Sequence, residues 1–476
     1  MVVGDIEIGT DILIVGAGPA GYTLAIRCAR LGMDVTLVNK NELGGVCLHR
    51  GCVPVKTLLY VYRLADDCRS ASHMGLSVGD VSVDAKKAND WKASVVRRLE
   101  SGIRELCLGS GVQILEGTCK FTSSSKATVL GPSGTQHAEF KRAVIATGSS
   151  HRPLSGLPFD GKLVIHPDEV MALDDSPEDI IMLGGGYGAI TLASLLVARG
   201  KRLTIIHKGE NVLSFLDADL IKPAIDKFKE KGVKIYSSPS WSVKRSDDKI
   251  MIDFEHDGKK DTVEASKLVP AIGLSANTED IGLENTGIKA GKNGFIETDD
   301  NFKTADPAFY AIGDVRSDHC NATMAFREAM SLAEMLNGKP GLPDCIALPQ
   351  SISTEPEIAS AGFGEKDAKA AGIDVVIGIF PFAANGKAVT IGKTDGFVKV
   401  VAEKSSHRIL GMHAVGPGAF DILQEGVLAI EMGSRLEDVA LTLHPHPTLS
   451  EAIKEACATA LGTSTNLKAH KDPGKT

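Results

Sequence analysis

The stretch DILIVGAGPAGYTLAIRCARLGMDVTLVNK, residues 11–40, carries the strongest architectural signal in the chain. Its apolar run before Gly16 predicts a buried strand, and the residues after Gly21 predict a helix of about 12 residues. The apolar run between Gly32 and Asn39 predicts a second strand. A strand, a crossover helix and a second strand together form a βαβ unit with parallel strands.

The same pattern occurs a second time. The stretch DIIMLGGGYGAITLASLLVARGKRLTIIHK, residues 179–208, aligns with the first stretch without a gap. It again has an apolar run, a glycine-rich turn, a helical pattern, a glycine at position 200 and a second apolar run. The repeat therefore predicts an α/β protein that contains two βαβ units.

The glycine-rich turns indicate dinucleotide binding. In such turns the first glycine makes the tight turn, and the second lets backbone amides approach a pyrophosphate. The third allows the helix to pack closely on the strand. One turn of this kind is a weak signal, but two turns in register, each inside a full βαβ pattern, are a strong one. The residues at these positions are Gly16, Gly18 and Gly21 in the first unit and Gly184, Gly186 and Ala189 in the second.

The end of the second strand departs from the usual pattern in both units. An acidic residue commonly binds the adenosine ribose there, but this chain has Asn39 and His207. Asparagine can still form a hydrogen bond with a ribose hydroxyl. His207, followed by Lys208, either faces a 2′-phosphate or lies in a solvated turn, so both NAD and NADP remain open from the residues alone.

Two cysteines lie close together in LGGVCLHRGCVPVK, residues 43–56. In an ideal helix the Cα atoms of residues i and i+5 are about 8.7 Å apart, beyond the roughly 7 Å limit for a disulfide. The neighbouring glycines and Pro54 allow a distorted turn that brings Cys47 and Cys52 together. They are a redox pair, part of a metal site or two core thiols. Because the sequence has no second close pair of ligands, we expect no metal site.

Two further segments end in glycine turns. KRAVIATGSS, residues 141–150, predicts a buried strand followed by Thr147 and Gly148. FYAIGDV, residues 309–315, places Asp314 directly after another strand, where it binds a polar ligand or simply makes a turn. Strands of period two follow the proline-rich segment and predict a third module that starts near Cys345.

The C-terminal segment HPHPTLSEAIKEACATALG, residues 444–462, pairs a histidine with a carboxylate. Glu451 beside His446 would orient the imidazole and stabilise its protonated form, as a general acid–base requires. The alternative is a capping box, in which Thr448 is the N-cap residue of a helix and Glu451 the third residue after it.

Composition narrows the class of protein. The chain has 476 residues, of which 43% are hydrophobic and 24% charged, and its net charge is −8. These values predict several globular domains and argue against a nucleic-acid partner. The sequence has no apolar run of about 18 residues and no secretory signal, so we expect no membrane partner. The acidic N-terminus without a secretory signal predicts a cytoplasmic protein, in which most of the nine scattered cysteines would stay reduced.

Together these motifs resemble the pyridine nucleotide–disulfide oxidoreductase family over essentially the whole chain. The motifs GAGPAG, GGVCLHRGCVPVK, ATGSS, GGGYGA, AIGDV and HPHPTLSE follow one another in the family's order. The resemblance implies an α/β fold with two Rossmann-like FAD- and NAD(P)-binding domains and a C-terminal α+β dimerisation domain. The implied domains are an FAD-binding domain with a helical insertion (1–150), a NAD(P)-binding domain (151–275), a central domain that completes the FAD site (276–344) and a dimer-interface domain (345–476).

The resemblance also implies a chemistry: oxidation of dihydrolipoyl groups, carried by a protein or a small dithiol, with FAD and NAD as cofactors. Cys47 would exchange with the substrate, Cys52 would face the flavin, and His446, paired with Glu451, would act across the interface of a homodimer. The implied cofactor-binding residues are Gly16, Gly18, Gly21, Asn39, Lys40, Gly45, Val46, Lys56, Gly117, Cys119, Thr147, Gly148, Ser149, Gly184, Gly186, Ala189, His207, Gly273, Asp314, Met324 and Ala325.

Some positions depart from the family's pattern. Thr191 replaces a glutamate that commonly pairs with the lysine at position 56, which leaves the role of Lys56 open. His49 and Arg50, between the two cysteines, either lower a thiolate pKa or face solvent. Two alternatives therefore stay open: an NADPH-dependent reductase of a low-molecular-weight disulfide, and a non-enzymatic FAD-binding redox sensor.

Overall fold

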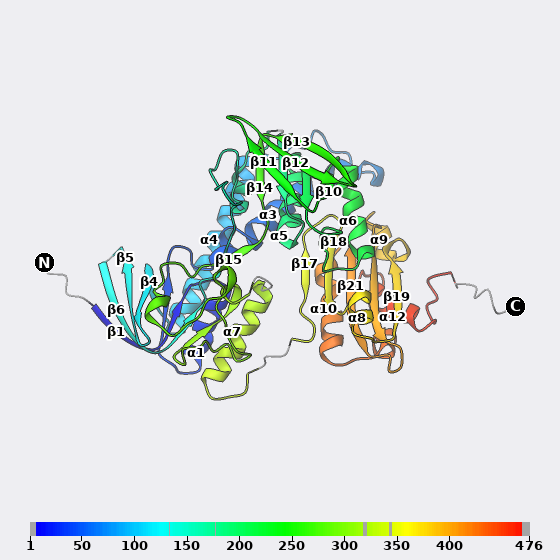
Figure 1. Cartoon of the computed structure of the whole chain (residues 1–476). Helices are drawn as coiled ribbons and strands as arrows, with labels where there is room; N and C mark the ends of the chain where they lie inside the picture. The colour runs from blue at the N-terminus through cyan, green and yellow to red at the C-terminus, as the bar shows by residue number, and fades with distance from the viewer. Residues whose placement is uncertain (1–5, 133, 177, 318–320, 342–344, 469–476) are drawn as a thin grey trace. The chain divides into compact units, whose positions relative to one another are not determined.

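The computed structural model describes residues 6–132, 134–176, 178–317, 321–341 and 345–468. The chain forms two compact units, and each combines segments that are distant in sequence. Unit 1 comprises Met1–Ser176 and Val269–Asp344, and unit 2 comprises Pro177–Leu268 and Cys345–Thr476. Figure 1 shows the elements along the chain, coloured from blue to red.

Unit 1 is built on a mixed sheet whose strand order is β3-β2-β1-β6-β5-β4, with β16 also paired to β6. The strands β3, β2, β1, β6 and β16 run parallel, whereas β4 and β5 form an antiparallel extension of β6. A short antiparallel pair, β7 with β15, lies outside this sheet. The strands are β1 (Ile6–Val15), β2 (Val35–Asn39), β3 (Gln113–Glu116), β4 (Thr118–Ser123), β5 (Lys126–Gly131), β6 (Gly134–Ile145), β7 (Ser149–His151), β15 (Leu274–Ala276) and β16 (Phe309–Ala311).

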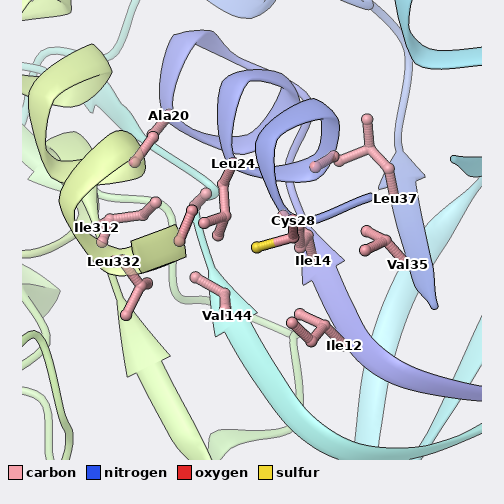
Figure 2. Close-up of a cluster of buried hydrophobic side chains, with 14 of the residues drawn as sticks. Ile12, Ile14, Ala20, Leu24, Cys28, Val35, Leu37, Val144, Ile312 and Leu332 are labelled. Carbon is pink, nitrogen blue, oxygen red and sulfur yellow. The ribbon is translucent and has the colours of Figure 1, made fainter. Parts of the chain in front are cut away.

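A hydrophobic core joins the helices of unit 1 to the sheet. All five residues of β2 are buried, as expected for a parallel strand covered on both faces. Figure 2 shows Leu24 and Cys28 of one helix packed toward Ile14 and Val144 of the strands, with Leu332 of a second helix beside them. The helices are α1 (Pro19–Arg30), α2 (Gly45–His49), α3 (Cys52–Ser70), α4 (Ala85–Gly109) and α7 (Ala322–Leu336).

Unit 2 contains the second βαβ element, β8-α5-β9, within a sheet of order β10-β9-β8-β14. The strands β8, β9 and β10 are parallel, and an antiparallel sheet β11-β12-β13 accompanies them. These elements are β8 (Asp179–Leu183), α5 (Tyr187–Ala198), β9 (Arg202–His207), α6 (Ala218–Glu230), β10 (Lys234–Ser237), β11 (Trp241–Arg245), β12 (Ile250–His256), β13 (Lys259–Ala265) and β14 (Lys267–Pro270).

The C-terminal part of unit 2 is an antiparallel sheet of order β17-β18-β21-β20-β19. Its apolar residues pack with those of α10 and α12 in one cluster. The elements are β17 (Gln350–Ile352), β18 (Glu357–Gly362), α8 (Glu365–Ala370), β19 (Val375–Pro381), α9 (Gly386–Thr390), β20 (Phe397–Glu403), β21 (Ile409–Gly416), α10 (Ala419–Glu431), α11 (Leu436–Ala440) and α12 (Glu451–Ala460).

The predicted fold class is confirmed, because both βαβ units and the separate C-terminal sheet are present. The boundaries of the four domains stay a prediction. Among the described residues, no helix has the length and apolar character needed to cross a bilayer.

Candidate active site

The first glycine turn, between β1 and α1, has no room for a side chain at Gly16 and Gly21 but has open space at Gly18. Gly16 has φ +106°, and a Cβ atom there would lie 2.3 Å from the carbonyl oxygen of Ala146. A Cβ atom on Gly21 would lie 1.8 Å from the carbonyl oxygen of Gly16, so neither position accepts a side chain. At Gly18 the nearest atom would be the Cα of Gly45, 4.0 Å away. This space adjoins the start of α1, where no side chain caps the helix, and it suits a pyrophosphate.

The segment 45–52, which carries both cysteines and is called the cysteine turn below, packs directly against this loop. Gly45 begins α2, and a Cβ atom there would lie 2.7 Å from the Cα of Gly18. The helix is interrupted at Gly51, which has φ −126° and ψ −110°, before α3 begins at Cys52. The interruption brings Cys47 and Cys52 within hydrogen-bonding reach as free thiols. The distorted turn that the sequence predicted is therefore present.

The two thiols differ in acidity. The hydrogen bond from Cys47 lowers the pKa of Cys52 to about 7, with help from the ammonium of Lys56 and against the effect of burial. The same hydrogen bond and burial raise the pKa of Cys47. Cys52 is thus the sulfur that holds negative charge, and Cys47 is the donor.

The charged residues between the cysteines have other partners. The Nε2 atom of His49 hydrogen-bonds the carbonyl oxygen of Leu43 at 3.0 Å. Arg50 forms ion pairs with Glu42 at 2.8 Å and with Asp168 at 3.3 Å. The cation that lowers the pKa of Cys52 is therefore Lys56, one turn further along α3.

The ends of β6 and β16 bring further predicted residues together. Ser149 donates a hydrogen bond to the Oδ2 atom of Asp314 at 3.2 Å, and the charge of Asp314 is felt by Cys52. The hydroxyl of Thr147 donates to the carbonyl oxygen of Asn277 at 2.7 Å, and the amide of Asn277 donates to the carbonyl oxygen of Gly148 at 2.9 Å. These residues form a polar cluster near the cysteine turn.

Glu328 stabilises the turn that carries Asp314, although no sequence motif marks this residue. Its buried carboxylate accepts hydrogen bonds from the amide of Gly313 and from Arg316, both at 2.6 Å. The contact fixes the turn that carries Asp314. Glu328 lies in the middle of α7, where an acidic residue would ordinarily face solvent, so only the tertiary structure identifies its role.

The remaining predicted cofactor residues of unit 1 lie at scattered places. The amide of Gly117 donates to the carbonyl oxygen of Asn39 at 2.8 Å, and Lys40 is exposed. The Cys119 thiol is buried in the core, which raises its pKa to about 12, so only its backbone is available to a cofactor. The others are Val46 in α2, Gly273 beside Arg152, and Met324 and Ala325 in the first turn of α7.

The second glycine turn, between β8 and α5, is also open at its middle. No atom lies within 4 Å of a Cβ placed on Gly186, whereas Ala189 is buried. His207 ends β9 and is only 3% exposed, so burial lowers its pKa and keeps it neutral. Lys208 lies over the ring of Trp241, 4.9 Å from its centroid.

His446 and Glu451 are in direct contact in unit 2. The Nδ1 atom of His446 lies 3.0 Å from Oε1 of Glu451, while Oε2 accepts the amide of Thr448 at 2.8 Å. Both hydrogen bonds lower the pKa of Glu451 against the opposing effect of burial. The predicted N-cap at Thr448 is wrong, because α12 begins at Glu451 with Ser450 as N-cap. One carboxylate therefore supports the turn and orients the imidazole.

The surroundings of His446 are exposed and apolar. The His446 side chain is 77% exposed, and large hydrophobic residues on neighbouring segments are also exposed. Leu443 is 93% exposed and Leu441 80% exposed. Exposed apolar groups at this density are typical of a surface that a protein partner covers.

Comparison with known proteins agrees with this geometry. The sequence model described as pyridine nucleotide-disulphide oxidoreductase matches residues 10–333, and the model of that family's dimerisation domain matches residues 348–457. The chain belongs to the pyridine nucleotide–disulphide oxidoreductase family. It is a flavoprotein disulfide oxidoreductase of the kind that uses FAD and NAD, and its dimerisation domain supports a homodimer.

The relatives of this oxidoreductase match over nearly their full lengths. Dihydrolipoyl dehydrogenase of Geobacillus stearothermophilus is 37% identical, with 98% of this chain and 99% of the relative covered. Dihydrolipoyl dehydrogenase of Halobacterium salinarum is 38% identical, with 97% and 98% covered. Among solved structures, LpdA from Mycobacterium tuberculosis matches with a TM-score of 0.85 and 26% identity over 94% of this chain and 99% of that one.

Proposed function

We propose that this flavoprotein oxidises dihydrolipoyl groups to lipoyl disulfides and delivers the electron pair to NAD. The observation that carries the proposal is the Cys47–Cys52 pair, whose sulfurs approach each other at a break between two helices. The full-length relatives named dihydrolipoyl dehydrogenase support this substrate class.

The acidity of the two cysteines assigns their roles. In the oxidised enzyme a substrate thiolate attacks the Sγ atom of Cys47, and the Cys47–Cys52 bond breaks. Cys52 leaves with the electron pair because the thiol of lower pKa is the better leaving group. The second substrate thiolate then attacks the substrate sulfur bound to Cys47, which releases the lipoyl disulfide and leaves two reduced cysteines.

His446 is the proton acceptor in this proposal. The substrate dithiol must lose protons before its sulfurs attack, and the imidazole that Glu451 orients offers a ring nitrogen as the proton acceptor. We propose that the imidazole acts on the Cys47 of the other protomer. The dimerisation domain and the exposed apolar residues around His446 support this arrangement.

The residues of unit 1 fit FAD. The open space at Gly18 suits the pyrophosphate, Asn39 lies at the ribose position, and Ser149 and Asp314 offer polar groups beside Cys52. When bound there, the flavin supplies the two-electron chemistry that links a dithiol to a nicotinamide. Lys56 stabilises the Cys52 thiolate on the protein side.

The nucleotide edge of unit 2 favours NAD over NADP. A 2′-phosphate requires a cation, but His207 is neutral because burial lowers its pKa, and Lys208 lies over Trp241. An NADPH-dependent disulfide reductase is therefore less well supported than NAD reduction.

The organisation proposed from the sequence accompanies this function. It comprises the domains 1–150, 151–275, 276–344 and 345–476. We also propose a cytoplasmic location, which is supported by buried cysteines that remain free thiols: Cys28, Cys107, Cys119 and Cys457.

Steady-state kinetics test the proposal. Purified enzyme is assayed with dihydrolipoamide and NAD, and in reverse with lipoamide, glutathione disulfide and related disulfides, using NADH and NADPH. We expect dihydrolipoamide with NAD to give the highest kcat/KM, by at least 100-fold over any other pair. A higher kcat/KM for NADPH with glutathione disulfide would refute the proposal. A protein that binds FAD but turns over none of these pairs would instead favour a redox sensor.

A further inference from the structure

The carboxyl ends of β2 and β3 join two polar residues that are far apart in sequence. Asn39 is the last residue of β2, Glu116 is the last residue of β3, and the parallel register places them side by side. The Nδ2 atom of Asn39 donates a hydrogen bond to Oε2 of Glu116 at 2.7 Å. Arg104 of α4 donates to the other carboxylate oxygen, Oε1, at 3.0 Å.

The hydrogen bond determines the orientation of the asparagine amide. An ionised carboxylate only accepts hydrogen bonds, so the NH₂ group of Asn39 must face Glu116 and its Oδ1 atom must point elsewhere. Among the described residues, none donates a hydrogen bond to that Oδ1 atom. Asn39 is only 3% exposed, and its backbone carbonyl is held by the amide of Gly117 at 2.8 Å. The Oδ1 atom is therefore a fixed acceptor.

Asn39 occupies the position where a carboxylate commonly receives the hydroxyls of the adenosine ribose. An asparagine alone is a poor replacement, because a free amide can turn its NH₂ group toward the ribose and it carries no charge. Glu116 prevents the amide of Asn39 from turning, and it supplies the negative charge that asparagine lacks. In this chain the carboxylate lies on the neighbouring strand.

We propose that Glu116 is a positioning residue for FAD, and that Glu116 and Asn39 together recognise the adenosine ribose. The inference deepens the proposed function, since it concerns the cofactor of the same site. Glu116 orients Asn39 so that Oδ1 accepts a ribose hydroxyl, and the shared negative charge strengthens that acceptor. A site of this kind distinguishes ribose from deoxyribose.

A purely structural role makes a different prediction. The ion pair of Arg104 with Glu116 is exposed by 42% and 41%, and exposed pairs of this kind contribute little to stability. If Glu116 served only this ion pair, its removal would weaken the binding of FAD and of a deoxyribose analogue equally, or would weaken neither. Arg104→Met then provides a matched control, because it breaks the ion pair and leaves the contact between Glu116 and Asn39 in place.

The test measures binding to the full-length apoprotein by quenching of flavin fluorescence, with FAD and with FAD that contains 2′-deoxyadenosine. We expect Glu116→Gln to raise the Kd of FAD about tenfold and the Kd of the deoxy analogue less than twofold, so that discrimination is lost. Arg104→Met should retain discrimination. In the double variant Asn39→Asp with Glu116→Gln, the carboxylate returns to β2 and discrimination should recover.

Three results would overturn the proposal: Kd values within twofold of wild type in Glu116→Gln, equal weakening of both flavins, or the same loss in Arg104→Met. Thermal unfolding of each apoprotein identifies a folding defect, and Glu116→Ala provides a second variant at the same partly exposed position. The measurement needs no turnover. A negative result therefore leaves the cysteine chemistry untouched, and a failure of dithiol oxidation leaves this inference untouched.

Discussion

The acidity of Cys52 provides a sharp test of the redox site. Its pKa is about 7 against an ordinary 9.0, and the hydrogen bond from Cys47 is the largest cause. That difference corresponds to about 3 kcal/mol in favour of the thiolate. At pH 7 about half of Cys52 is ionised, compared with about 1% for a thiol of pKa 9. Loss of the donor in Cys47→Ala should therefore reduce the thiolate population sharply.

The assay follows the long-wavelength thiolate-to-flavin absorption band of the holoenzyme as a function of pH. Cys47→Ser is the matched control, since its hydroxyl still donates a hydrogen bond to Cys52 while disulfide exchange is lost. We expect a midpoint near 7 in Cys47→Ser and a midpoint above about 8 in Cys47→Ala, where only Lys56 and the backbone amide of Cys52 oppose burial. Equal midpoints in the two variants would show that the hydrogen bond does not cause the low pKa.

The first glycine turn, the His446–Glu451 pair and the buried His413 provide three further tests. Gly18→Ala should leave the thermal stability of the apoprotein within about 2 °C of wild type but weaken FAD binding at least tenfold. Gly21→Ala should destabilise the apoprotein itself, because its methyl group would lie 1.8 Å from a carbonyl oxygen. A stable Gly21→Ala protein would contradict this. His446→Gln should lower kcat for dihydrolipoamide at least 100-fold, and Glu451→Gln about tenfold, because the imidazole then loses the carboxylate that orients it. Rates within a few-fold of wild type in both variants would refute the assignment. Burial lowers the pKa of His413 below its ordinary 6.5. As pH falls, this histidine is therefore protonated in the unfolded chain before it is protonated in the folded protein. The free energy of unfolding should then decrease below pH 6.5 by up to about 1.4 kcal/mol per pH unit. Urea unfolding at pH 7.5 and 5.5 should show this loss in wild type and less of it in His413→Gln, and equal losses would contradict the prediction.

The features that the sequence predicted are those that local sterics determine. The two βαβ units follow from apolar runs and glycine turns, and in the first turn Gly16 and Gly21 have no room for a Cβ atom. The break between Cys47 and Cys52 follows from Gly51, which lies between the two helices. These signals are contained within about 30 residues of sequence, so no knowledge of tertiary structure was needed.

The features that the sequence missed depend on contacts between distant segments. Glu116 reaches Asn39 only because β3 pairs with β2, and Glu328 supports Gly313 from a helix that follows it. Neither contact leaves a periodic pattern. The sequence alone also does not show whether Arg50 acidifies a cysteine, because its partners Glu42 and Asp168 are brought to it by the tertiary structure.

The central claim is that the sulfurs of Cys47 and Cys52 form and break one bond while electrons move between substrate and flavin. Anaerobic titration of the oxidised holoenzyme with dihydrolipoamide, followed by alkylation and peptide mass spectrometry, tests it most directly. We expect one equivalent of dithiol per FAD to convert a Cys47–Cys52 disulfide into two alkylatable thiols and to produce the long-wavelength band. Reduction of the flavin with both cysteines already free before the titration would contradict it.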